Sequence, residues 1–130
     1  MPWTVVFDEE TQVVDSRYEG VLTGDELRAS IHAAIATGAR HQTNLHLADC
    51  SRMEVAHSFL DLYGLADMLA ETGFTTSVKD AMVLPQLEAS AEYVEFWETA
   101  CRNHGMNIRI FRDRESALAW LCTPPATPPP

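Results

Sequence analysis

The chain alternates between short strand-forming segments and longer segments of helical periodicity, and this alternation most constrains its fold. Five segments rich in β-branched, aliphatic or aromatic residues are predicted strands, at residues 3–7, 12–21, 44–49, 80–84 and 107–111. Four segments with apolar residues at helical spacing are predicted helices, at residues 23–38, 57–71, 87–103 and 114–121. The order ββαβαβαβα predicts a single α/β domain, in which four helices flank a mixed, mostly parallel five-stranded sheet.

Local signals support this assignment at several boundaries. The short polar segment 8–11 predicts an antiparallel hairpin between the first two strands. Thr23 and Glu26 have the spacing of a capping box at the start of the first helix, and Gly38 is placed to end that helix. Asp113 is expected to cap the last helix. Residues 80–84 are almost continuously apolar, which is typical of a strand covered on both faces.

Charge and cysteine content limit the partners and the compartment. The sequence has 9 Lys and Arg residues against 19 Asp and Glu residues, a formal net charge of −10. Because an acidic domain repels phosphate backbones and anionic lipids, we expect no nucleic-acid partner and no membrane insertion. The three cysteines lack CxxC spacing, and the sequence has neither a signal-peptide pattern nor a long apolar run. A reducing, cytoplasmic location is therefore expected.

Two segments of the chain have motifs typical of a known family. The first is the C-terminal strand Ile108–Phe111, followed by the polar cap Asp113 and by Ala117–Leu121, which reads Ala-Leu-Ala-Trp-Leu. The second is Gly20–Thr23, which leads into the first helix. Both segments resemble the SpoIIAA-like family, which is related to the STAS domains. The resemblance covers nearly the whole folded chain and implies a SpoIIAA-like domain at residues 1–122. Residues 123–130, with five prolines, are predicted to be a disordered tail.

The resemblance implies a small bacterial cytoplasmic domain that acts by binding rather than by catalysis. In several STAS relatives a partner kinase phosphorylates a serine at the start of the helix after the third strand. Ser58 stands at that place, but His57 replaces the aspartate that precedes the serine in those relatives, and the motif's second serine and glycine are absent. The resemblance therefore favours a binding or regulatory domain and gives little support for a phosphorylation switch.

The segment from Asp49 to Ser58 is the predicted recognition site for a partner or ligand. Asp49, Cys50 and Ser51 come at the carboxyl end of a central strand, where open α/β sheets bind ligands. His57 and Ser58 begin the next helix, whose N-terminus favours anions. The same residue types also suit a turn and a helix cap, because Asp and Ser satisfy local backbone groups. Both interpretations stay open at this point.

A second predicted site consists of aromatic and sulfur-containing side chains. Met82 of the fourth strand and Tyr93, Phe96 and Trp97 of the third helix can line a pocket for an apolar ligand. Because the three aromatic residues occupy more than one side of their helix, one of them can instead contact a second subunit. The pattern predicts a pocket or a homodimer interface, with ordinary core packing as the alternative.

No cofactor and no metal site is predicted. The histidines lack the spacing of metal ligands, and His46 and Asp49 should point to opposite faces of a strand. We therefore expect a non-enzymatic domain that recognises a protein partner or a small apolar ligand, with a homodimer as one arrangement. The alternative is a small hydrolase or transferase that uses Cys50 or Ser58 as nucleophile and His57 as base.

Overall fold

The computed structural model describes residues 2–56, 59–71, 78–86 and 88–123, and its strands form one sheet in the order β1-β2-β3-β4-β5. β1 and β2 pair antiparallel, whereas the pairs β2–β3, β3–β4 and β4–β5 are parallel. The predicted mixed, mostly parallel sheet is confirmed. The strands are β1 (Trp3–Asp8), β2 (Val13–Thr23), β3 (Leu45–Ala56), β4 (Lys79–Val83) and β5 (Asn107–Phe111).

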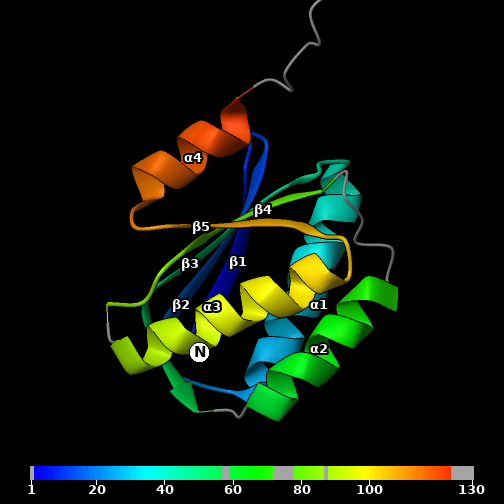
Figure 1. The fold of residues 1–130 in the computed structure, drawn as a ribbon. Helices are drawn as coiled ribbons and strands as arrows, with labels where there is room; N and C mark the ends of the chain where they lie inside the picture. The colour runs from blue at the N-terminus through cyan, green and yellow to red at the C-terminus, as the bar shows by residue number, and fades with distance from the viewer. Residues whose placement is uncertain (1, 57–58, 72–77, 87, 124–130) are drawn as a thin grey trace, which may run out of the picture.

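Three helices cover one face of the sheet and the fourth covers the other (Figure 1). The helices α1 (Gly24–His41), α2 (Phe59–Glu71) and α3 (Glu88–Asn103) connect consecutive parallel strands. Because each new strand lies beside the preceding one, right-handed crossovers place all three connecting helices on the same face. The helix α4 (Arg114–Cys122) follows the last strand and packs on the opposite face against β3, β4 and β5.

Each face has its own apolar cluster. The larger cluster lies under α1–α3 and includes the buried residues Leu22, Leu65 and Ile108. The smaller one lies under α4 and includes Ala117 and Leu121, with Phe111 and Leu118 packed against it. The C-terminal strand and helix therefore pack as the sequence predicts.

The start of α1 follows the prediction, but its end does not. The Thr23 hydroxyl accepts a hydrogen bond from the backbone N–H of Glu26 at 3.3 Å, and the Glu26 carboxylate accepts one from the backbone N–H of Thr23 at 3.0 Å. The helix does not end at Gly38; it ends at His41, and Gln42 adopts a left-handed φ of 53°. Gly38 instead leaves room for the His46 ring, because a Cβ there would lie 3.0 Å from its Nε2 atom.

Strand β3 is twice as long as predicted. The sequence predicts a strand at 44–49 and a connection at 50–55, but β3 continues to Ala56. Its second half pairs with the end of β2, from Glu19–Arg52 to Thr23–Ala56, after a bulge in the register. In the described register β4 pairs with β3 no further than Asp49, so polar residues such as Arg52 are tolerated in the one-sided extension. The alternation of apolar and polar residues is therefore weak in the second half of β3.

The other boundaries agree with the predictions to within two residues. Asp113 caps α4 as predicted, because its carboxylate accepts a hydrogen bond from the backbone N–H of Ser116 at 2.7 Å. His57, Ser58, Leu87 and the proline-rich residues 124–130 lie outside the described residues. No helix within the described ranges is long and apolar enough to cross a membrane.

Candidate functional site

Strand β3 divides the predicted recognition segment between the two faces of the sheet. Neighbouring side chains of a strand point to opposite faces. Asp49 therefore contacts α4, whereas Cys50 belongs to the apolar cluster under α1–α3. Ser51 hydrogen-bonds to Asp49, and His57 and Ser58 lie outside the described residues. The described part of the segment thus belongs to two environments rather than to one site.

On the α4 face, Arg114 connects two aspartates of neighbouring strands. Its Nη2 donates to Oδ2 of Asp15 at 2.8 Å, and its Nη1 donates to Oδ2 of Asp49 at 2.9 Å. The two aspartate side chains are 8% and 11% exposed, so both carboxylates are largely shielded from water. Arg17 supplies a second cation to Asp15, with Nη2 3.1 Å from Oδ2. These ion pairs attach the first turn of α4 to β2 and β3.

Hydrogen bonds favour the ionised form of Asp49. Burial alone would raise the pKa of this carboxyl, but the donors Ser51 and Arg114 outweigh burial and hold the pKa below its ordinary value. The Ser51 hydroxyl donates to Oδ1 at 2.6 Å and the Ser51 backbone N–H donates at 3.1 Å. The geometry thus gives Asp49 and Ser51 a role in holding α4 on the sheet.

Cys50 lies on the opposite face and is 2% exposed. Burial, followed by the negative charges of Asp49 and Asp80, raises the pKa of its thiol. Because the thiolate is the reactive form of cysteine, Cys50 is an unreactive thiol at neutral pH. This environment does not favour Cys50 as the nucleophile of a hydrolase or transferase.

We expect a thiol reagent to modify Cys122 and to leave Cys50 and Cys101 unmodified in the folded protein. Cys122 is exposed, whereas the other two thiols are buried and burial raises the pKa of each. Mass spectrometry after brief treatment with iodoacetamide should find one adduct, on the Cys122 peptide. Unfolding in guanidinium chloride should make all three thiols reactive. Rapid modification of Cys50 in the native protein would contradict the burial and restore the catalytic alternative.

A cavity of about 80 Å³ lies between the sheet and the helices α1–α3. A single water needs about 10–15 Å³ by this measure, so the cavity has room for a ligand of about five non-hydrogen atoms. Its mostly apolar wall comes from all three helices and from β2, β3 and β4. The wall includes the side chains of Ser16, Tyr18, His46, Ala48, Cys50, Met53, Asp80, Met82, Tyr93 and Trp97.

Two titratable side chains stand side by side in the cavity wall. His46 of β3 and Asp80 of β4 are register partners in the parallel pair, and both line the cavity. Burial raises the pKa of Asp80 from 3.8 to about 7 and lowers the pKa of His46 from 6.5 to about 4. Both groups are therefore largely uncharged between about pH 4 and about pH 7.

Asp80 has no hydrogen-bond partner among the residues that the structure describes, and burial is the cause of its raised pKa. The described wall of the cavity contains neither lysine nor arginine. Lys79, the preceding residue, donates instead to the carbonyl oxygens of Trp120 and Thr123 on the opposite face. A strongly shifted carboxyl in a concave, apolar site is a physical indicator of function, so this cavity is the candidate functional site.

The Tyr18 side chain is held in place by a short hydrogen-bond chain. Its hydroxyl lies 2.9 Å from Oγ of Ser30, and Ser30 donates its own proton to the carbonyl oxygen of Leu27 at 2.7 Å. Since a serine hydroxyl has one proton, Tyr18 must be the donor to Ser30. Burial raises the pKa of the Tyr18 hydroxyl, so the ring in the cavity wall is uncharged, and its hydroxyl proton is already donated to Ser30.

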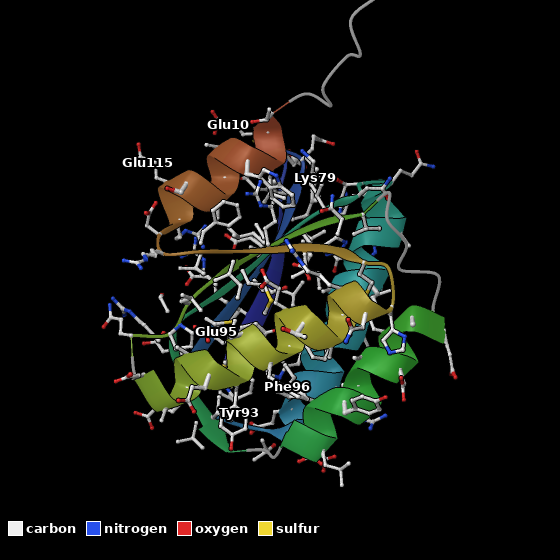
Figure 2. The ribbon with its side chains drawn as sticks, in the orientation of Figure 1. Glu10, Lys79, Tyr93, Glu95, Phe96 and Glu115 are labelled. Carbon is white, nitrogen blue, oxygen red and sulfur yellow. The ribbon has the colours of Figure 1, made fainter. Side chains whose placement is uncertain are left out.

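The predicted group of Met82, Tyr93, Phe96 and Trp97 lies on the cavity side of the molecule. Met82, Tyr93 and Trp97 line the cavity, and Phe96 packs against the same apolar cluster. Figure 2 shows Tyr93 and Phe96 on the side of α3 that faces away from α4. The geometry within one chain favours the pocket over the subunit interface for these residues.

The polar residues of the cavity wall that sequence reasoning missed are Asp80, Ser16 and Tyr18, and His46 was considered only as a metal ligand. The available signal was a single acidic residue in an otherwise apolar strand, Asp80-Ala81-Met82-Val83-Leu84. Within the described ranges no group of three His, Cys, Asp or Glu side chains could hold a metal ion. His46 and Asp49 lie on opposite faces, as predicted.

Comparison with known proteins supports the fold. No protein-family model matches the chain, and no curated protein matches it. Among solved structures, the chain is similar to an uncharacterised protein of the DUF3478 family with a SpoIIAA-like fold from Shewanella loihica PV-4. The two are 18% identical, the match covers 92% of each chain, and the TM-score is 0.57. This chain therefore has the SpoIIAA-like fold.

Proposed function

We propose that this chain is a non-enzymatic binding domain that takes one small, largely apolar ligand in the cavity between the sheet and α1–α3. The cavity itself is the observation that carries the proposal. Binding sites for small molecules are concave and mostly apolar, with a few polar groups that orient the ligand. Here the apolar wall is interrupted by Ser16, His46 and Asp80, which lie on three adjacent strands.

The chemistry of the cavity favours binding over catalysis. Covalent catalysis needs a nucleophile that is activated by a neighbouring base. Cys50 is a buried thiol with a raised pKa, and the Tyr18 hydroxyl already donates its proton to Ser30. The catalytic alternative that pairs Ser58 with His57 involves residues outside the described ranges.

A protein partner has weaker support than a small ligand. The large exposed apolar side chains within the described ranges are Val6 and Val21 on the sheet and Leu60 and Tyr63 on α2. Isolated exposed apolar residues are common on monomeric proteins and need no partner. The cavity, in contrast, joins side chains from six elements around one concave space.

Filling the cavity should abolish binding. Ala48 lines the cavity, and Ala48→Leu adds three carbon atoms to the wall. Titration with the neutral probe tert-butanol, followed by NMR of ¹³C-labelled methionine methyl groups, should shift the Met53 and Met82 signals saturably in the natural protein. The shifts should disappear in Ala48→Leu because the larger side chain occupies the same volume.

Ala119→Leu is the matched control, because it adds the same atoms at an exposed position of α4. This variant should bind tert-butanol as the natural protein does. The Met106 methyl signal, which arises from a buried residue outside the cavity wall, reports whether each variant keeps its core. Equal binding by Ala48→Leu would contradict the proposal, as would shifts of Met53 and Met82 that never saturate.

A further inference from the structure

The ligand of this cavity must suit a carboxyl that has no counter-ion. Above about pH 7 Asp80 ionises. The titratable groups that face it are Tyr18, His46, Cys50 and Cys101. Each is uncharged at neutral pH, since burial raises the pKa of Tyr18 and of both thiols and lowers that of His46. The described wall thus supplies an anion without a cation, and a cationic ligand would compensate its charge.

Aromatic rings surround the same space. Tyr18 comes from β2, and Tyr93 and Trp97 come from α3 (Figure 2 labels Tyr93). The face of an aromatic ring attracts a cation, and alkylated ammonium groups are recognised by cages of such rings together with acidic side chains. Met53 and Met82 add polarizable sulfur atoms that adapt to the shape of a ligand.

Size and overall charge restrict the ligand further. The 80 Å³ cavity has room for about five non-hydrogen atoms, which excludes bulky molecules unless the helices move. The formal net charge of −10 raises the local concentration of cations around the domain. Both observations favour a compact cation.

We propose that the cavity selects a compact organic ammonium ion, whose N–H groups donate to the Asp80 carboxylate while its alkyl groups contact the rings of Tyr18, Tyr93 and Trp97. This inference rests on the proposed function and names the chemical class of its ligand. It assigns Asp80 the specificity of the site, since the apolar wall alone would accept a neutral molecule of the same shape.

Three molecules that share a tert-butyl group test the inference: tert-butylammonium and tert-butanol, which have the same size and charges of +1 and 0, and trimethylacetate, which is two non-hydrogen atoms larger and has a charge of −1. Binding is measured from the Met53 and Met82 methyl signals at about pH 6 and about pH 8. At the higher pH we expect tert-butylammonium to bind about tenfold more tightly than tert-butanol, because its N–H donors bind an ionised acceptor. Its affinity should rise from pH 6 to pH 8 as Asp80 ionises.

Two variants locate the effect. Asp80→Asn should abolish the preference for the cation and its pH dependence. Glu95→Gln removes the same charge from an exposed position of α3 and should leave both unchanged. Equal binding of tert-butanol and tert-butylammonium would overturn the inference and leave the proposed function intact, and so would preferential binding of trimethylacetate. If none of the three shifts Met53 and Met82, both proposals are wrong. The pH dependence of the natural protein decides the matter even if Asp80→Asn fails to fold.

Discussion

Replacing Arg114 by methionine should lower the free energy of unfolding by about 3 kcal/mol, because it leaves the shielded carboxylate of Asp49 without a cation and that of Asp15 with Arg17 alone. Asp15 and Asp49 are 8% and 11% exposed, so water replaces the lost hydrogen bonds poorly. Breaking a buried ion pair from one side typically costs about 3–5 kcal/mol. Arg114 itself is 32% exposed, which places the expected loss at the lower end of that range.

Urea unfolding at neutral pH measures this loss, and Arg112→Met is the control. Arg112 is an exposed neighbour whose replacement removes the same charge. The control should change the free energy of unfolding by less than about 0.5 kcal/mol. The deficit of Arg114→Met should also shrink on acidification, because protonation of Asp49 removes the negative charge that Arg114 compensates. A loss below about 1 kcal/mol for Arg114→Met would mean that the two aspartates are better solvated than the structure indicates.

The second large effect concerns Asp80, whose replacement by asparagine should remove a loss of stability that the natural protein suffers at high pH. The pKa of Asp80 is raised from 3.8 in the unfolded chain to about 7 in the folded one. The folded state therefore retains a proton that the unfolded state releases, and stability falls as pH rises between these two values. A shift of this size corresponds to about 4 kcal/mol. The free energy of unfolding of Asp80→Asn, relative to the natural protein, should rise by that amount between about pH 4 and about pH 8.

The contribution of His46 to the free energy of unfolding should depend on pH in the opposite direction, so His46 is a useful comparison for Asp80. Its pKa is lowered from 6.5 to about 4, so its contribution to stability is present above pH 6.5 and is lost as pH falls toward 4. The contributions of Asp80 and His46 to the pH dependence of the free energy of unfolding have opposite signs over this range. Removing one of the two groups therefore leaves the pH dependence that the other produces. Denaturant unfolding of the natural protein, Asp80→Asn and His46→Gln at several pH values measures all three slopes. Parallel curves for Asp80→Asn and the natural protein would show that Asp80 has an ordinary pKa.

The element order and the parallel pairing could be predicted because they depend on local patterns. The strand Asn107–Phe111 and the cap Asp113 are both found where periodicity and capping chemistry place them. The second half of β3 could not be predicted, because a strand that pairs on one side tolerates charged residues such as Arg52 and loses its apolar signature. Gly38 was mistaken for a helix end because its actual role, leaving room for His46, depends on tertiary packing.

The candidate site was less accessible to sequence reasoning than the fold. Asp80 and His46 are 34 positions apart in the chain, and the register of β3 against β4 alone makes them neighbours. Met82, Tyr93 and Trp97, which the sequence proposes for a pocket or a subunit interface, do line the cavity, and sulfur and aromatic side chains on facing elements are a compositional signal. A single aspartate in an apolar strand, such as Asp80, is a weaker signal than a group of such side chains. Its meaning comes from the apolar surroundings that the fold builds around it.

The position of strand β3 between α4 and the cavity limits the insertions that its sequence can tolerate. Its consecutive residues Asp49 and Cys50 point to opposite faces of the sheet. Asp49 forms an ion pair with Arg114 of α4, whereas Cys50 belongs to the apolar cluster beside the cavity. Because the side chains of a strand alternate between faces, insertion of one residue before Asp49 would turn the Asp49 carboxylate toward the apolar cluster and the Cys50 thiol toward α4. The strand thus acts as a shared wall, and a change in its register would damage the anchorage of α4 and the cavity at the same time.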